Sequence, residues 1–394
     1  MHSCTVNNGD CGANATCSYN ATTNAVKCTC KAGYTNAGSS VNVVCKDSCT
    51  VNNGGCGADA ACSYSATTNS VKCTCTNGYI YAVSASKNIR TVNISANAIW
   101  AQNGVAVAGG SGGGDATNQL NSPRGLFVGD DQTVVIADFG NNRIMQLKNG
   151  DTTNGLIVAG GNGQGSGLNQ LNSPTDVLID KETDSLIICD GGNQRVVRWS
   201  RRSGTTKGEI LISNIDCHAL AMDEQRYLYV SDWKNDEVRR YQGCDKIGIL
   251  VAGGNGRGTG LNQLNFPAYL FIDRQQSVYV SEWQNHRVMK WNKGAKEGIV
   301  IAGGQGAGSS LTQLNGPLGI IVDTLGALYV ADDWNNRVMR WTQGATQGTV
   351  IAGGNGQGAG ANQFYLVVGL SFDRYSNLYV ADYNNHRVQR FSIE

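Results

Sequence analysis

The chain has 394 residues, a formal net charge of +1 and 14 cysteines. This near-neutral balance provides no net field to attract nucleic acid or an anionic membrane. The longest apolar runs are strand-sized, well short of the about 20 residues that a membrane-spanning helix needs. We therefore expect more than one domain, no membrane span in this chain and no nucleic-acid partner.

The first 90 residues are rich in cysteine, since 11 of the 14 lie before residue 76. They have few large apolar residues, so disulfides must replace a hydrophobic core. The start, Met1-His2-Ser3-Cys4, has neither a basic nor an apolar signal region, so we expect an incomplete N-terminus. By spacing alone, six cysteines admit 15 pairings; these are Cys4, Cys11, Cys17, Cys28, Cys30 and Cys45.

The spacing of these six cysteines, with Gly33-Tyr34 after the fifth, resembles an EGF-like module over residues 1–46. The resemblance implies disulfides Cys4–Cys17, Cys11–Cys28 and Cys30–Cys45. A second, incomplete copy over residues 47–90 lacks the sixth cysteine and leaves Cys75 over. The same resemblance implies that its remaining cysteines are in disulfides, namely Cys49, Cys62, Cys56 and Cys73. Neither copy has the acidic cluster of the calcium-binding variety, so calcium is not expected.

Three sequons in this part of the chain are candidate glycosylation sites, namely Asn14, Asn20 and Asn93. They would carry glycans in a secreted protein, and chance occurrence in an Asn- and Thr-rich arm is the alternative reading. The disulfide pattern is the firmer sign of an oxidising compartment. We therefore expect an extracellular or secretory-pathway glycoprotein.

After a linker at residues 91–98, a repeat of about 50 residues fills the chain from 99 to 394. Five Gly-rich loops recur, at 108, 159, 252, 302 and 352, and a degenerate copy lies at 211–214. All six copies have short apolar strand-like runs and a motif like Tyr-Val-Ala-Asp, found at 135–138, 187–190, 229–232, 279–282, 329–332 and 379–382. Four short strands per copy describe one antiparallel sheet. A lone sheet cannot bury both faces, so six copies predict an all-β, six-bladed β-propeller.

The motifs Gln-Leu-Asn-x-Pro-x-Gly and Tyr-Val-Ala-Asp-x-x-Asn-x-Arg-Val, combined over six copies, resemble the NHL-repeat family. The last copy stops after its third strand, whereas an unclaimed fourth-strand signature lies upstream at 105–109. We expect residues 105–108 to pair with 387–391, because this closure removes an open sheet edge.

An acidic residue and an arginine recur five positions apart in five copies: Asp138 and Arg143, Asp190 and Arg195, Glu282 and Arg287, Asp332 and Arg337, Asp382 and Arg387. A structural ion pair across a hairpin is the expected role. The third copy has Asp232 and Glu237 instead, so Asp232 must find another partner or hold a cation.

No metal site, cofactor or catalytic residue is predicted. His286 and His386 occupy the same hairpin phase in different copies and His218 starts another strand, so the three cannot converge on one zinc ion. Nucleophile-elbow and phosphate-loop motifs are absent from the sequence. The odd cysteines allow Cys189–Cys217 with Cys75–Cys244, or buried free thiols.

Aromatic residues in the hairpins between second and third strands predict a binding face: Phe139, Trp233, Trp283, Trp334 and Tyr383. A connection shortened to 214–216 predicts a notch floored by His218 and flanked by Trp233, Lys234 and Asn235. The other reading is that the rings cap the core between blades. We expect a non-catalytic recognition protein that binds a protein, peptide or glycan; the alternative is a channel-centred, metal-dependent hydrolase or lyase. The oligomeric state does not follow from the sequence.

Overall fold

The computed structural model describes residues 14–20, 25–31, 34–36, 45–47, 60–65, 70–75, 92–148, 154–202, 204–243 and 247–394. The chain divides into two compact units, one of Met1–Val83 with Tyr241–Ile247 and one of Ser84–Arg240 with Gly248–Glu394. No helix in the described residues is long and apolar enough to cross a membrane.

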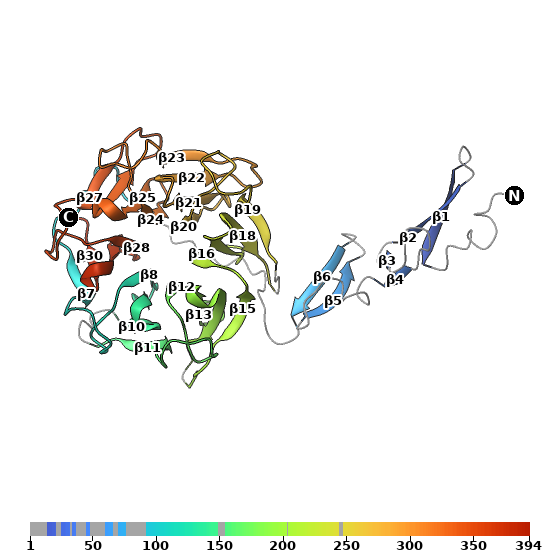
Figure 1. Ribbon diagram of the computed structural model, residues 1–394, viewed down its shortest axis with the longest axis horizontal. Coiled ribbons are helices and arrows are strands. Elements are labelled where there is room, and N and C mark those ends of the chain that lie inside the picture. The colour runs from blue at the N-terminus through green and yellow to red at the C-terminus, as the bar shows by residue number, and fades with distance from the viewer. Residues whose placement is uncertain are drawn as a thin grey trace. The chain divides into compact units, whose positions relative to one another are not determined.

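The larger unit is a six-bladed β-propeller, as the repeat predicts, and each blade is a four-stranded antiparallel sheet (Figure 1). The first strands surround the central channel and are β8 (Pro123–Val128), β12 (Pro174–Asp180), β16 (Cys217–Met222), β20 (Pro267–Ile272), β24 (Pro317–Val322) and β28 (Val367–Phe372). The second strands are β9 (Val134–Asp138), β13 (Ser185–Asp190), β17 (Leu228–Asp232), β21 (Val278–Glu282), β25 (Leu328–Asp332) and β29 (Leu378–Asp382).

The third strands are β10 (Arg143–Leu147), β14 (Arg195–Ser200), β18 (Glu237–Tyr241), β22 (Arg287–Trp291), β26 (Arg337–Trp341) and β30 (Arg387–Phe391). The outer strands are β11 (Leu156–Gly160), β15 (Glu209–Ser213), β19 (Ile249–Gly253), β23 (Ile299–Gly303), β27 (Thr349–Gly353) and β7 (Val105–Gly109). Blades are numbered here 1 to 6, from β8–β11 to β28–β30 with β7.

Burial explains why the second strands are apolar almost throughout. Every residue of these strands is buried, because each sheet lies between two neighbouring blades. The outer strands instead begin with two exposed or half-buried residues and bury their fourth, as in the exposed Ile299 and the buried Ala302 of β23. The core is therefore a ring of apolar clusters between blades, not one central cluster.

The sixth blade takes strands from both ends of the propeller. β7 pairs antiparallel with β30, and Val388 lies opposite Ala108. This is the pairing that the phase of the repeats predicts. The sheet edge of β30 is therefore covered by the chain's own upstream strand.

Residues 92–101, which include the expected linker from residue 92 onwards, lie against blades 5 and 6. Val92 and Ile94 are buried, and the Val92 carbonyl accepts a hydrogen bond from the Thr324 amide at 2.9 Å. Arg340 donates to the carbonyls of residues 94, 95 and 96. Trp100 packs on Tyr329 and Phe372. This stretch contributes to the propeller core.

The five acid–arginine pairs form buried ion pairs, as the sequence predicts. Asp138 and Arg143 lie 2.7 Å apart, the Glu282–Arg287 pair forms as well, and the equivalents elsewhere are Asp190–Arg195, Asp332–Arg337 and Asp382–Arg387. Each guanidinium also donates to three carbonyls of the Gly-rich connection that leads into its own blade; for Arg143 these belong to Asp115, Ala116 and Gln119. The pair thus fixes the connection between blades.

Blade 3 departs from this pattern because its connection is short. Three residues, 214–216, join β15 to β16, so the long Gly-rich loop is missing there. Glu237 replaces the arginine and pairs with Arg239, while Asp232 accepts hydrogen bonds from Asn235. Asp232 therefore has another partner, which is one of the two outcomes that the sequence allows.

A disulfide, Cys189–Cys217, ties blade 2 to blade 3 beside this short connection. It links the second strand of one blade to the first strand of the next, and both cysteines are fully buried. The sequence allowed either this bridge or free thiols. Cys244, the proposed partner of Cys75, lies outside the described residues.

In the smaller unit, the structure describes hairpins. β1 (Ala15–Asn20) pairs with β2 (Ala25–Cys30), β3 (Tyr34–Asn36) with β4 (Cys45–Asp47), and β5 (Ala60–Ser65) with β6 (Ser70–Cys75). Cys17, Cys28 and Cys30 are disulfide-bonded. Cys4, Cys11, Cys49 and Cys56 lie outside the described residues, so the implied pairing stays a prediction.

Truncation tests the closure. Deleting residues 1–110 removes β7 and exposes the edge of β30, so we expect the melting temperature to fall by about 10 °C or more, equivalent to several kcal/mol. Deleting residues 1–90 leaves all six sheets complete and should change it little. Equal losses from the two truncations, measured by calorimetry, would contradict the closure.

The disulfide between blades 2 and 3 should contribute measurably to stability. Replacing both Cys189 and Cys217 by alanine opens a loop with a sequence separation of 28. We expect a loss of about 2–4 kcal/mol in the free energy of unfolding. Denaturant unfolding measures the loss, and peptide mapping without reduction checks the bridge; recovery of both cysteines as alkylated peptides would show that it does not form.

Candidate functional site

A cavity of about 500 Å³ opens where the first strands begin, and we call it the mouth cavity. Two rings of six residues line it, each with one member per blade. The floor ring consists of the second residue of each first strand, namely Arg124, Thr175, His218, Ala268, Leu318 and Val368. The wall ring consists of the residue after each second strand, namely Phe139, Gly191, Trp233, Trp283, Asp333 and Tyr383.

Aromatic side chains form much of the wall. Trp233 stacks on Phe266 with ring centroids 5.3 Å apart, and Phe266 meets Trp283 edge to face. Trp233 is 36% exposed, whereas Trp283 and Tyr383 are partly buried against the core cluster between blades. The two readings from the sequence are therefore both represented: Trp283 and Tyr383 line the cavity and also pack against the core.

The remaining predicted residues lie outside the cavity lining. Trp334 is 50% exposed and packs edge-on against Trp283 at 5.2 Å. It stands one position after the wall ring, where blade 5 has Asp333. The exposed Lys234 lies 3.8 Å from a carboxylate oxygen of Asp216. Asn235 donates to Asp232, which is the role of the equivalent asparagine in other blades.

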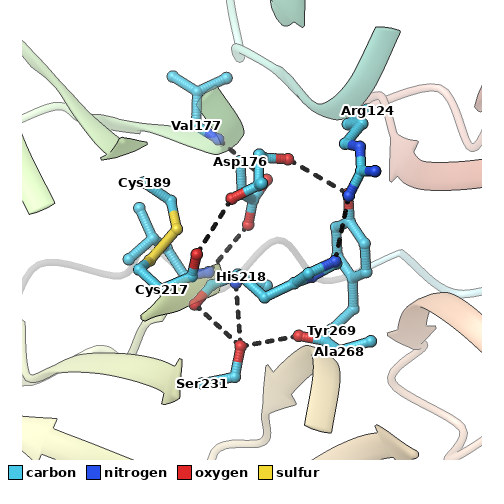
Figure 2. Close-up of a disulfide and its surroundings, with 12 residues drawn as sticks. Arg124, Asp176, Val177, Cys189, Cys217, His218, Ser231, Ala268 and Tyr269 are labelled. Carbon is cyan, nitrogen blue, oxygen red and sulfur yellow. Dashed lines mark hydrogen bonds between the residues drawn. A yellow bond between two sulfur atoms is a disulfide. The ribbon is translucent and has the colours of Figure 1, made fainter. Parts of the chain in front are cut away.

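The floor is polar on one side, where Arg124 extends from blade 1 towards blade 3 (Figure 2). Its guanidinium lies over the Phe139 ring at 4.2 Å and near the Tyr383 ring at 5.5 Å. Nη1 lies 3.4 Å from His218 Nε2. His218 in turn meets Tyr269 edge to face.

His218 is neutral at physiological pH. Burial lowers the pKa of its imidazole to about 3, and the charge of Arg124 acts in the same direction. Since Arg124 can only donate, Nε2 accepts and the ring proton lies on Nδ1. The Ala268 carbonyl raises the pKa slightly, but Nδ1 has no hydrogen bond of ordinary geometry among the described residues.

Two buried carboxyl groups lie near the floor. Burial raises the pKa of Asp333 to about 7, although a hydrogen bond from Trp283 and the charge of Arg124 oppose this. Its Oδ1 is buried without a hydrogen-bond partner among the described residues. Asp176 accepts hydrogen bonds from the Val177 and Leu220 amides at 2.9 Å, and burial raises its pKa to about 7. Gly125 leaves room for this carboxyl, because a Cβ there would lie 2.1 Å from Oδ1.

The sequence analysis missed Arg124, Asp333, Asp176 and Phe266. Aligning the six copies position by position would have found the first three, because they are charged where other blades have small, apolar or aromatic residues. Phe266 stands before the proline of blade 4, where the backbone is left-handed with φ of 53°. The search for repeated aromatic positions passed over it because no other blade has an aromatic residue there.

The other two histidines of the propeller, His286 and His386, hold blades together. His286 Nδ1 accepts from the Gly316 amide at 3.1 Å, and His386 Nδ1 accepts from the Ser122 amide at 3.0 Å. These contacts join blade 4 to blade 5 and blade 6 to blade 1. Within the described part of the chain, no group of three histidine, cysteine or acidic side chains is placed to hold a metal ion.

Comparison with known proteins identifies the fold. No protein-family model and no curated protein matches the chain. A solved structure of a protein of unknown function from Bacteroides thetaiotaomicron is 18% identical with a TM-score of 0.60, covering 75% of this chain and 76% of its own. An auxiliary nutrient binding protein from the same organism is 14% identical with a TM-score of 0.57, covering 74% and 76%.

A second auxiliary nutrient binding protein, from Bacteroides ovatus, is 14% identical with a TM-score of 0.55 and covers 76% of this chain and 78% of its own. At such low identity the likeness extends to the fold alone. The chain is an all-β six-bladed propeller with propeller-type neighbours.

The raised pKa of Asp333 predicts a pH-dependent effect of Asp333→Asn. Because the folded-state pKa of about 7 lies above the ordinary value of 3.8, the folded protein keeps a proton that the unfolded chain loses between about pH 4 and 7. Wild-type stability therefore falls through this window relative to the variant. We expect the variant to be more stable at pH 8, by at most about 4 kcal/mol. Denaturant unfolding between pH 4 and pH 8 measures the free energy of unfolding of both proteins. A difference between the wild type and Asp333→Asn that stayed constant over this range would contradict the prediction.

Proposed function

We propose that this chain is an extracellular, non-catalytic recognition protein that binds a protein, peptide or glycan at the mouth cavity. The main support for this proposal is the mouth cavity, which has a volume of about 500 Å³ and is lined by aromatic rings with few polar groups. Binding sites for small ligands and hot spots for larger ones share this composition. The auxiliary nutrient binding proteins of similar fold agree with a role in binding.

A secreted location is part of this proposal. The Cys189–Cys217 bridge and the disulfide-bonded Cys17, Cys28 and Cys30 favour an oxidising compartment. Asn93 is exposed, as glycosylation requires, and Asn14 is partly exposed. We assign residues 1–46 and 47–90 to EGF-like modules and 99–394 to an NHL-type propeller, on the cysteine spacing and the repeat motifs.

The wall residue Trp233 provides the test. Arrays of glycans and peptides should yield ligands of the wild-type protein, and Trp233→Ala should lose them with little change in melting temperature, because the ring is partly exposed. Trp283→Ala should lose them too but cost about 1–3 kcal/mol, since its ring packs against the core.

The matched control is Trp334→Ala, which removes a more exposed ring outside the cavity lining. It should retain the ligands. If Trp334→Ala abolished binding and Trp233→Ala did not, the ligand would lie elsewhere on this face.

One observation favours the enzymatic alternative. Asp176 and Asp333, two buried carboxyl groups with pKa values raised to about 7, lie near the channel together with the neutral His218. Perturbed groups of this kind concentrate at catalytic sites. Stoichiometric metal in the purified protein, measured by elemental analysis, would favour a metal-dependent hydrolase or lyase over a binding protein.

A further inference from the structure

The mouth cavity contains a half-buried arginine, Arg124, that differs from the arginines of the five ion pairs. Arg143, Arg195, Arg287, Arg337 and Arg387 each have a carboxylate and three carbonyls as partners, as described above. Among the described residues, no carboxylate lies within 4 Å of Arg124. Its hydrogen bonding is limited to Nη1 and His218 at 3.4 Å, and Nε is buried without a partner.

An unpaired guanidinium in such a place costs free energy. Burying a charge without a counter-charge is unfavourable, and each buried donor without an acceptor adds to this cost. The floor position itself does not require an arginine, because four of the other blades have Thr175, Ala268, Leu318 and Val368 there. The fold alone therefore gives no reason for Arg124.

The surroundings hold the guanidinium in place. The guanidinium lies 4.2 Å from the centroid of the Phe139 ring and 5.5 Å from that of Tyr383. Its Nη1 donates a hydrogen bond to the neutral His218. Arginine stacked on aromatic faces keeps its N–H groups in the plane of the stack, free for an acceptor. A ligand anion that enters the mouth cavity thus meets a preorganised cation without having to order a flexible side chain.

We propose that the mouth cavity binds a ligand through its carboxylate, which Arg124 holds while the Trp233 and Phe266 rings contact an apolar part of the same ligand. This inference rests on the proposed recognition function and specifies its chemistry. Among the described residues that line the cavity, Arg124 is the one cation, so it matches a single negative charge. A dianionic phosphate fits less well, because a single guanidinium would have to balance two negative charges beside the Asp333 carboxyl.

Two sources of such a carboxylate are compatible with the cavity, an acidic sugar and the C-terminus of a peptide. The test uses matched pairs of probes: uronate-containing oligosaccharides against their carboxyl-reduced forms, and free-acid peptides against the same peptides with amidated ends. Binding is measured by titration calorimetry and by tryptophan fluorescence with the full chain. The pair that shows the larger difference identifies the source.

Three variants accompany the probes. Arg124→Gln should reduce affinity for the carboxylate member about 10- to 100-fold and remove the preference over the neutral member, as expected for a charge-assisted hydrogen bond. Its melting temperature without ligand should stay equal or rise, because an unpaired charge is removed. Arg257→Gln is the matched control, since Arg257 also lies over an aromatic ring, Phe266, but already pairs with Asp236. Trp233→Ala should weaken the binding of both the acidic and the neutral probe of a pair.

The outcomes separate this inference from the recognition function. If acidic and neutral probes bind equally and Trp233→Ala weakens both, the cavity is a binding site but the carboxylate assignment is wrong. If inorganic phosphate displaces the probes at lower concentration than acetate does, the site prefers phosphate and the assignment is again wrong. If no probe of either pair binds at its solubility limit, the inference and the recognition function of this cavity both fail.

Discussion

The propeller depends on a buried acid–arginine pair that five of its six blades share. The acid ends the second strand and the arginine begins the third, so the pair closes a hairpin within one sheet. The same guanidinium holds three carbonyls of the incoming Gly-rich connection. A buried ion pair is tolerable when additional hydrogen bonds satisfy its donors. Here the carbonyls of the connection supply these acceptors, which positions each connection and, with it, the start of each first strand.

Blade 3 shows that the arginine and the connection belong together. Where the Gly-rich loop is missing, its carbonyls are missing too, and an arginine at position 237 would have had several unused donors. Glu237 and the Cys189–Cys217 bridge stand there instead. The disulfide links blades 2 and 3 covalently at the point where the hydrogen bonds from the arginine to the Gly-rich connection are missing.

The repeat made the architecture predictable. Blade number, closure through residues 105–108 and the five ion pairs all follow from positions that recur in phase, because the same sterics and hydrogen bonding apply in each copy. The site could be predicted only in part. Phe139, Trp233, Trp283, Tyr383 and His218 were found as hairpin aromatics or as the residue beside a shortened loop, and they line the mouth cavity.

Arg124 and Asp333 escaped the sequence analysis for a physical reason. In a symmetric fold the repeated residues build the scaffold, whereas Arg124 and Asp333 break the symmetry and place charged groups in the lining of the mouth cavity. Trp334, an aromatic residue one position out of phase, lies outside the cavity lining and packs against Trp283. Which residue of a hairpin turns towards the channel depends on its place after the second strand, and composition alone does not reveal it.

The shared sixth blade also affects how the chain folds. β7 is synthesised before any of the first strands, whereas its partner β30 follows the last of them in the chain. Until β30 has been synthesised, β7 is an unpaired strand and the first five blades lack the sixth blade that completes the ring. Pairings so distant in sequence form slowly and leave edges exposed in the meantime, so the ring cannot close before all six copies of the repeat have been synthesised.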